Sequence, residues 1–411
     1  MAQVEKIAGG VTAAKGYAAA SAAAGIKYQN RTDMALIYSS VPCTAAGTFT
    51  SNVVKAAPVI WDRDIVRKSD GKVSAVIVNS GIANACTGEL GLSVCAKTAA
   101  VAGEALGIPA KSVLLGSTGV IGMQIPVDKI TEGARKLAAS KAETLEAGTA
   151  AAKAIMTTDT HHKEIAYQFQ VGGKTATLGG CAKGSGMIHP NMCTMLCYLT
   201  TDLAISKHLL QKALSDVVTD TFNMISVDGD MSTNDTLILL ANGLAGNPEI
   251  TGENEDYAVF KKVLFSVCRF LAMQMAGDGE GAQHLIEAKV VHADTKDHAK
   301  TLAKSVIQSN LTKAAIFGRD ANWGRVLCAL GYSGAPFDPE NVDLYFAAGD
   351  QKMLIFTNGS AADYSEEKAK KLLSNEAVTI LADMHMGEEE ATAWGCDLTY
   401  DYVKINADYR S

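Results

Sequence analysis

Several patterns that mark common classes of protein are missing from these 411 residues. No block of consecutive basic residues occurs in a chain of net charge −7, so nothing suggests the basic face that a nucleic-acid interface needs. No stretch reaches the ~18 consecutive apolar residues that a membrane-spanning helix requires. We therefore expect neither a nucleic acid nor a membrane among the partners of this protein.

The cysteines also lack the spacings that would indicate disulfides or zinc. There are nine, an odd number, and none belongs to a C-x-x-C pair. Cys193 and Cys197 are four residues apart, but no second pair of ligands follows at a zinc spacing. Scattered cysteines of this kind are typical of reduced thiols packed as small apolar groups. We expect a cytoplasmic protein without a metal site.

The overall composition, with 48% hydrophobic and 20% charged residues, is that of a globular protein and not of a disordered one. Its length favours two or three domains, and short apolar strands alternate with longer amphipathic helices, which predicts a layered α/β fold. With no linker visible, we place the domain boundary near residue 284, between a main domain at 1–284 and a C-terminal α/β domain at 285–411.

The predicted strands are 34–38, 74–79, 113–115, 195–200, 344–347 and 353–356, and the predicted helices are 90–106, 127–140, 147–156, 204–225 and 257–275. The alanine-rich run 18–25 is too short for a secretion signal and reads as a small-residue connection.

The most informative segment is 183–197, in which a lysine on a glycine-rich turn is followed by a Pro-Asn turn and then by Cys193-Thr194 before an apolar strand. A threonine in this setting suits self-cleavage. Its hydroxyl can attack the carbonyl of Cys193, and water can open the resulting ester. The new α-amine, with a pKa of ~7.7–8.0, could then act as the base for the hydroxyl of the same residue. The alternative is that Thr194 simply opens a buried strand.

Two further positions suit acyl transfer. Gly116-Ser117-Thr118-Gly119 follows a predicted strand, and the Thr118 hydroxyl with the Gly119 N–H could stabilise an oxyanion. The same run could equally be a glycine-rich turn without a catalytic role. Lys183 does not match a nucleotide-binding loop, because the order Lys-Gly-Ser-Gly is not that of the motif. As a compact cation beside Thr194, Lys183 could hold a substrate carboxylate or shape the pKa of the Thr194 amine.

Ordered motifs along nearly the whole chain resemble those of the ornithine acetyltransferase family, arginine-biosynthesis proteins that move an acetyl group from N-acetylornithine to glutamate. Besides 183–197, the matching segments are 10–16, 45–50, 78–88, 116–122, 228–235, 277–282, 318–325 and 405–411. The chain departs from the family at Cys193, where alanine is commoner, and at Gln283-His284, where Thr-Lys is usual.

The resemblance implies a self-processing layered α/β sandwich with a smaller C-terminal α/β domain, whose tail returns to the active site. It implies cleavage between Cys193 and Thr194, Thr194 as the nucleophile, and Thr118 and Gly119 as the oxyanion pair. It also implies no cofactor, with acetyl-coenzyme A as a candidate co-substrate, and a heterotetramer of two copies of each fragment. The implied substrate contacts are Thr157, Lys183, Thr194, Glu280, Asn406 and Ser411.

Two other functions stay open at this point. An aminopeptidase or amidase on the same self-processing fold would use water in place of glutamate. An amino-acid-binding protein would leave Thr194 uncut. The residues themselves do not decide whether acetyl-coenzyme A also donates an acetyl group, nor whether arginine regulates the protein.

Overall fold

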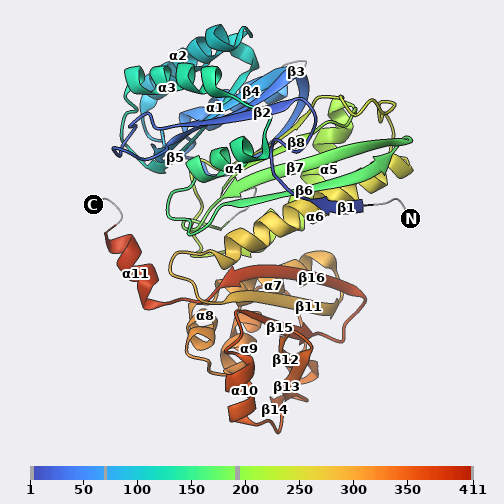
Figure 1. The fold of residues 1–411 in the computed structure, drawn as a ribbon. Coiled ribbons are helices and arrows are strands. Elements are labelled where there is room, and N and C mark those ends of the chain that lie inside the picture. The colour runs from blue at the N-terminus through green and yellow to red at the C-terminus, as the bar shows by residue number, and fades with distance from the viewer. Residues whose placement is uncertain (1–3, 69–71, 190–194, 409–411) are drawn as a thin grey trace. The chain divides into compact units, whose positions relative to one another are not determined.

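The computed structural model describes residues 4–68, 72–189 and 195–408, and the chain divides into two compact units (Figure 1). Unit 1 comprises Met1–Gly184, Asn191–Thr219 and Met231–Leu271, and unit 2 comprises Ser185–Pro190, Asp220–Asp230 and Ala272–Ser411. The boundary expected near residue 284 falls inside unit 2, because the last turn of a long helix and two earlier segments also belong to that unit.

The described part of unit 1 is built on a nine-stranded sheet in the order β1-β6-β7-β8-β10-β3-β4-β5, with β2 paired to β3. Strand β3 is long enough to pair with β10 through its second half and with β2 and β4 through its first half. β4 and β5 run parallel, as do β8 and β10. The strands are β1 (Val4–Ile7), β2 (Tyr17–Ala22), β3 (Met34–Phe49), β4 (Val73–Ile82), β5 (Val113–Val120), β6 (Lys163–Val171), β7 (Lys174–Lys183), β8 (Leu196–Thr201) and β10 (Thr236–Ala241).

Alternating side chains of β3, β4 and β5 supply two different cores. Ile37, Val76 and Leu114 pack into one cluster, which also contains the buried residues of α4. Their neighbours Leu36 and Ile77 point to the other face of the sheet and pack with α2 and α3. Because successive strand residues face opposite sides, strands that are apolar at every position lie between two layers. The layered α/β fold is thereby confirmed.

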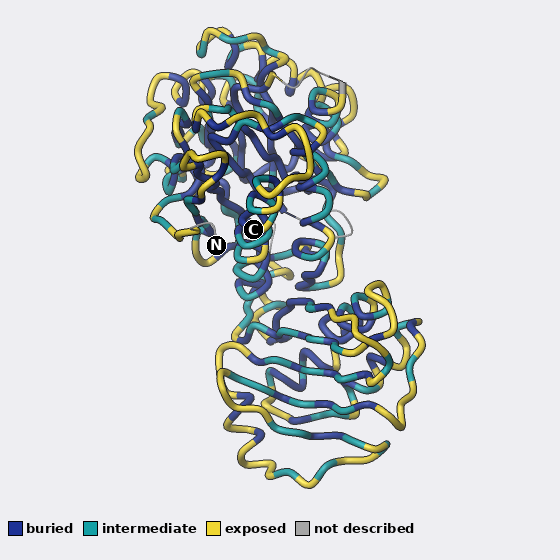
Figure 2. The backbone as a smooth tube through the Cα atoms, turned by 90° about the vertical axis from the view of Figure 1, so that its right-hand side faces the viewer, coloured by how far each residue is buried: buried dark blue, intermediate teal, exposed yellow. Residues whose placement is uncertain are grey.

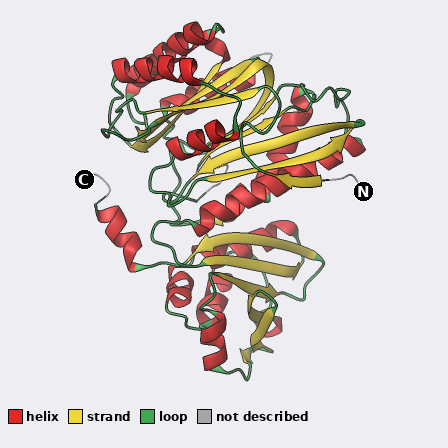
Figure 3. Cartoon of the chain, in the orientation of Figure 1, coloured by secondary structure: helices red, strands yellow, loops and turns green. Residues whose placement is uncertain are grey.

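Helices cover both faces of this sheet (Figure 3). They are α1 (Ala57–Lys68), α2 (Gly88–Leu106), α3 (Val127–Ser140), α4 (Leu145–Ala154), α5 (Lys207–Thr219) and α6 (Glu255–Gly277), whose last turn belongs to unit 2. Helix α2 ends at Gly107, which adopts the left-handed conformation with φ of 69° that suits glycine.

Two local predictions from the sequence were wrong. The run 18–25 is not a connection, because Tyr17–Ala22 form β2, which pairs in full with β3. The helix predicted at 204–225 spans only Lys207–Thr219. Ile205 pairs with Ile250 before the helix begins, and a short 3-10 turn (Phe222–Met224) and strand β9 follow it. Long-range pairing overrides helical periodicity at both ends.

Unit 2 is a smaller α/β domain on a seven-stranded sheet in the order β14-β13-β12-β15-β11-β16-β9, counted over its described residues. Its strands are β9 (Ile225–Ser226), β11 (Leu285–Ala293), β12 (Asp343–Ala348), β13 (Gln351–Thr357), β14 (Ser360–Ala361), β15 (Ala377–Asp383) and β16 (Glu389–Cys396). Its helices are α7 (Lys296–Gln308), α8 (Asn310–Phe317), α9 (Trp323–Gly331), α10 (Glu366–Leu372) and α11 (Tyr400–Ala407). Six residues of α7 are buried, whereas α11 has no buried residue. Figure 2 shows buried and exposed segments alternating along the backbone.

None of the helices in the described ranges is both long and apolar enough to cross a membrane. The eight described cysteines are free thiols, six of them buried. Burial raises the pKa of Cys95 to about 12, with the charge of Asp62 acting in the same direction, so this thiol is packed in its protonated form.

Candidate active site

The residues predicted for the site fall into three sets. Cys193, Thr194 and Ser411 lie outside the described residues. Thr118, Gly119, Thr157 and Lys183 belong to unit 1, and Glu280 and Asn406 belong to unit 2.

Lys183 connects the group in unit 1. It is the last residue of β7, and its side chain is only 9% exposed. Its Nζ donates hydrogen bonds to Oγ1 of Thr157 at 2.8 Å and to Oγ1 of Thr118 at 3.3 Å. Three of the predicted residues, from three separate elements, therefore meet at one ammonium group. Since Thr118 accepts from Lys183, its own O–H remains able to donate to another oxygen.

Gly119 follows Thr118 near the end of β5, so the 116–119 run is strand and not a turn. Gly119 has a φ of 129°, and in the parallel register it lies opposite Gly81 of β4. A Cβ at Gly119 would come within 2.3 Å of the carbonyl carbon of Gly81. Only glycine fits at position 119, and Gly81 has a φ of 99°, which also favours glycine.

Polar side chains hold this end of β5 from two sides. Ser117 donates through Oγ to Oδ1 of Asn79 at 2.6 Å. Nδ2 of Asn234 donates to the carbonyl oxygens of Ser117, at 2.8 Å, and Ala83, at 2.6 Å. All three side chains are buried. The 78–88 motif thus contacts the candidate oxyanion strand through the Ser117 side chain, and the 228–235 motif contacts it through the Ser117 carbonyl, roles that sequence analysis missed.

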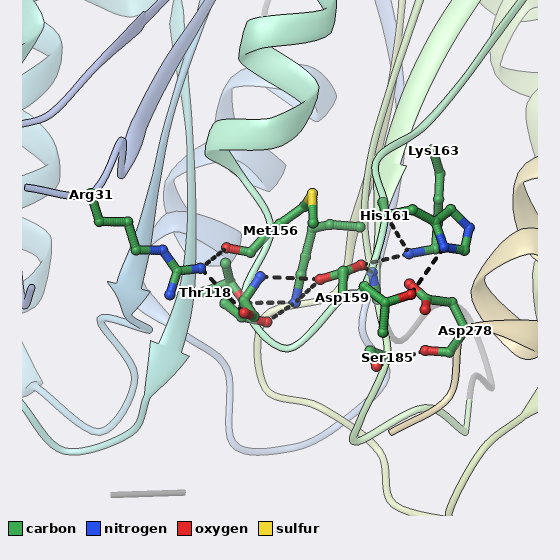
Figure 4. Close-up of polar contacts among 12 residues, drawn as sticks. Arg31, Thr118, Met156, Asp159, His161, Lys163, Ser185 and Asp278 are labelled. Carbon is green, nitrogen blue, oxygen red and sulfur yellow. Dashed lines mark hydrogen bonds and ion pairs between the residues drawn. The ribbon is translucent and has the colours of Figure 1, made fainter. Parts of the chain in front are cut away.

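Thr157 lies in a turn after α4 that is tied down at its backbone. Its N–H donates to Oδ2 of Asp159 at 3.1 Å. Nη2 of Arg31, in the loop between β2 and β3, donates to the carbonyl oxygens of Met156 at 2.9 Å and Thr157 at 3.2 Å (Figure 4). The turn is therefore held from both of its ends, which orients the Thr157 hydroxyl towards Lys183.

Asp159 and Lys163 form a buried ion pair that sequence analysis also missed. Their side chains are fully buried, and Nζ of Lys163 lies 2.8 Å from Oδ1 of Asp159 (Figure 4). Burial raises the pKa of Asp159, but the charges of Lys183 and Lys163 and hydrogen bonds from Lys163 and Gly184 outweigh it and hold the pKa at about 2. The sequence signal is the polar 157–160 turn, which directly follows the helix predicted at 147–156.

Glu280 and Asn406 meet within unit 2. Nδ2 of Asn406, on α11, donates to Oε2 of Glu280 at 2.7 Å. The backbone N–H of Glu280 donates to the carbonyl of Ser185 at 3.0 Å. The carboxyl group lies directly against Gly186, where a Cβ would come 2.4 Å from its carbon. Glu280 is buried, and its carboxylate is therefore oriented by Asn406 and by the 185–186 backbone.

A second pair supports the turn that carries Glu280. Nδ1 of His284 lies 2.8 Å from Oδ2 of Asp397, and Oδ1 of Asp397 accepts from the N–H groups of Gln283 and His284. Thr399, next to α11, donates to the carbonyl of Gly281 at 2.7 Å. The Gln283-His284 departure from the family pattern thus falls in a structural pair that anchors the start of the C-terminal segment.

The remaining histidines near the motifs have local partners. Nδ1 of His189 lies 3.2 Å from Oγ of Ser226, and burial lowers the pKa of this imidazole. His161 is exposed, and Nε2 of His162 lies 3.6 Å from Oε1 of Glu164. Within the described ranges, no group of three histidine, cysteine or carboxylate side chains is placed to hold a metal ion.

The group in unit 1 combines a hydroxyl, a strand-end glycine and a buried ammonium, which are the parts that an acyl-transfer site uses against a developing oxyanion. Together with the layered α/β fold, these features define the class as an acyl-group-transferring enzyme.

Comparison with known proteins identifies the family. The ArgJ family model matches residues 18–411, and the chain belongs to this family. It is 52% identical over 410 residues to the arginine biosynthesis bifunctional protein ArgJ of Symbiobacterium thermophilum, covering 99% of this chain and 100% of that protein. It is 51% identical over 395 residues to ArgJ 1 of Clostridium acetobutylicum, covering 96% of each. The protein is thus an arginine-biosynthesis acyltransferase and a homologue of ornithine acetyltransferase.

Solved structures include similar chains. That of the arginine biosynthesis bifunctional protein ArgJ from Bacillus halodurans is 45% identical, with a TM-score of 0.48, and the match covers 51% of this chain and 96% of that one. The ornithine acetyltransferase of Mycobacterium tuberculosis, complexed with ornithine, is 39% identical with a TM-score of 0.43, over 47% of this chain and 100% of that one.

Proposed function

We propose that this enzyme transfers the acetyl group of N2-acetyl-L-ornithine to L-glutamate through an acetyl ester on Thr194. The observation that carries the proposal is the convergence of Thr118 and Thr157 on the ammonium of Lys183. Lys183 pairs in the sheet with Leu196, which is the second residue after Thr194 in the sequence. The lysine therefore lies opposite the strand that begins two residues after the proposed nucleophile in the sequence.

In the first half-reaction the Thr194 hydroxyl attacks the acetyl carbonyl, and the negative charge develops on the carbonyl oxygen. Thr118 through its O–H and Gly119 through its N–H stabilise that oxygen. The carbon–nitrogen bond breaks, the α-nitrogen of ornithine takes the proton that left Thr194, and ornithine departs. The α-amine of Thr194, released by cleavage after Cys193, serves as the proton carrier.

In the second half-reaction the α-amine of glutamate attacks the ester carbonyl. The carbon–oxygen bond to Thr194 breaks, the hydroxyl is re-formed, and N-acetylglutamate leaves. Both substrates carry an α-carboxylate, which Lys183 can hold in turn, with Thr157 fixing the lysine. Ornithine is cationic at its side chain and glutamate is anionic, so the carboxylate of Glu280, oriented by Asn406, favours the ornithine step. Ser411 completes the proposed set of substrate contacts.

This ester chemistry requires no metal or organic cofactor. Acetyl-coenzyme A enters the proposal only as a second donor, which would make N-acetylglutamate directly. We also propose that cleavage yields two fragments that stay together as a heterotetramer of two copies of each. The enzyme would act in the cytoplasm, without nucleic acid or membrane as a partner.

The test is incubation of purified protein with N2-acetylornithine labelled in its acetyl group. The fragment beginning at Thr194 should carry the label when glutamate is absent and should lose it to N-acetylglutamate when glutamate is added. Initial rates should show parallel-line, ping-pong kinetics. Acetate released equally fast with and without glutamate would instead make the protein a hydrolase. The same assay with acetyl-coenzyme A determines whether it is a donor.

A further inference from the structure

The buried carboxylate of Asp159 contacts several parts of the candidate site at once. Its Oδ1 accepts from Nζ of Lys163 at 2.8 Å and from the N–H of Gly184 at 2.7 Å. Its Oδ2 accepts from the N–H of Thr157 at 3.1 Å and lies 3.9 Å from Nζ of Lys183. One carboxylate thus joins the turn after α4, the start of β6 and the end of β7 (Figure 4).

These contacts determine where the ammonium of Lys183 lies. The bond to Gly184 fixes the backbone that follows Lys183, and the bond to Thr157 fixes the residue whose hydroxyl accepts from Lys183 at 2.8 Å. The negative charge of Asp159 then attracts the ammonium itself. The position of the Lys183 ammonium therefore depends on Asp159, which lies behind it.

Lys163 offsets the free-energy cost of burying the Asp159 carboxylate. A fully buried carboxylate is costly unless it is paired and hydrogen-bonded, and Lys163, with a fully buried side chain of its own, supplies the pairing. Two ammonium groups and one carboxylate carry a combined charge of +1. Asp159 can consequently hold Lys183 in place while the three groups together still attract an anion.

We propose that Asp159 is a positioning residue, which fixes the ammonium of Lys183 against Thr118 and Thr157, and that Lys163 holds Asp159 in place for this purpose. Asp159 itself touches no substrate in this scheme, which rests on the proposed function for the identity of the ligand. Asp159→Asn preserves the shape of the side chain but turns one oxygen into an NH₂ group. That group would face the N–H of Thr157 or a lysine ammonium, from neither of which it can accept a hydrogen bond. The negative charge that attracts the Lys183 ammonium is also removed.

The experiment measures how strongly the enzyme prefers a ligand with an α-carboxylate. We compare kcat and KM for N2-acetylornithine and for its α-carboxamide in fully cleaved wild-type protein, Asp159→Asn and Lys183→Met. The ratio of kcat/KM for the carboxylate substrate to kcat/KM for the carboxamide should be largely lost in Lys183→Met. In Asp159→Asn this ratio should fall at least tenfold, mainly because KM for the carboxylate substrate rises. Equal losses on both substrates in Asp159→Asn would show a merely structural role and overturn the proposal.

The matched control is Glu164→Gln. Glu164 is a largely buried carboxylate on β6, next to Lys163, and it accepts from Oγ1 of Thr149 at 2.6 Å rather than contacting Lys183. Its substitution should leave the carboxylate preference unchanged. Lys163→Met provides a second variant in case Asp159→Asn does not fold, and the same fall in preference is expected.

Equilibrium binding separates this proposal from the proposed function. Calorimetry with glutamate and with its α-carboxamide needs no turnover. A wild-type protein that transfers no acetyl group, yet prefers the carboxylate and loses that preference in Asp159→Asn, would refute the transfer reaction and support the positioning role. If the wild-type protein transfers the acetyl group but Asp159→Asn keeps the full preference for the carboxylate ligand, the transfer reaction is supported and the positioning role is refuted. A wild-type protein without any carboxylate preference would overturn the positioning role outright.

Discussion

Asn406 and Glu280, 126 residues apart in the sequence, are joined by a 2.7 Å hydrogen bond from Nδ2 to Oε2. The bond connects α11, a helix without buried residues, to the turn that follows α6. An exposed helix of eight residues has little intrinsic stability. Contacts such as this one therefore help to hold the C-terminal segment beside the carboxylate that it orients.

We predict that Gly186→Ala weakens binding of N2-acetylornithine. The new methyl group would come 2.4 Å from the carboxyl carbon of Glu280, so the carboxylate must move and its bond to Asn406 is lost. A displaced carboxylate also loses its charged hydrogen bond to the substrate ammonium, which contributes about 1.5–3 kcal/mol, so KM should rise roughly tenfold or more. Gly331→Ala is the matched control, because nothing lies within 4 Å of the added methyl group. An unchanged KM in Gly186→Ala would contradict the substrate role of Glu280.

Cleavage is predicted to depend on the Thr194 hydroxyl. Wild-type protein should separate under denaturing electrophoresis into fragments of 193 and 218 residues, the second beginning with threonine. Thr194→Ala should remain one chain of 411 residues. Cys193→Ala restores the residue that is commoner in the family and should still be cut. Wild-type protein that stays intact would refute self-cleavage.

Thr118→Ala should lower kcat much more than it raises KM, because the hydroxyl is needed mainly when charge develops on the oxyanion. Loss of one such donor typically costs about 3 kcal/mol, or roughly a hundredfold in rate. Thr118→Ser keeps the hydroxyl and should retain most activity. Since cleavage passes through a similar intermediate, kinetics are measured on protein whose cleavage has been verified. Full turnover in cleaved Thr118→Ala would exclude Thr118 from the reaction.

Stability in acid should depend on Asp159. Its pKa in the folded protein is lowered from the ordinary value of 3.8 to about 2, so the ionised form stabilises the fold. This contribution, roughly 2 kcal/mol, is complete above about pH 5 and is lost as pH falls towards 2. Urea unfolding of wild type and Asp159→Asn should therefore show a larger stability difference at pH 6 than at pH 3. A difference that grows on acidification would contradict the assigned ionisation.

The sequence alone determined the positions of those helices and strands that short-range patterns of apolar residues mark. The helix predicted at 127–140 coincides with α3, and the one predicted at 90–106 lies within α2 and ends at the same residue. The strand predicted at 74–79 lies within β4, which is buried at every position, because no alternation of polar residues marks a solvent-facing side. The motifs also indicated the family, since many ordered matches do not depend on knowing the fold.

Tertiary structure decided which distant residues meet. Lys183 joins Thr118 and Thr157 because β7, β5 and the turn after α4 end close together, and no periodicity in the sequence encodes that proximity. The same holds for Asp159, because a polar turn in the sequence does not indicate that Lys163, Gly184 and Thr157 share its carboxylate. Local patterns report which face of an element is apolar. The packing of elements against one another places a buried charge beside its partners, and in this protein it is what assembles the candidate site.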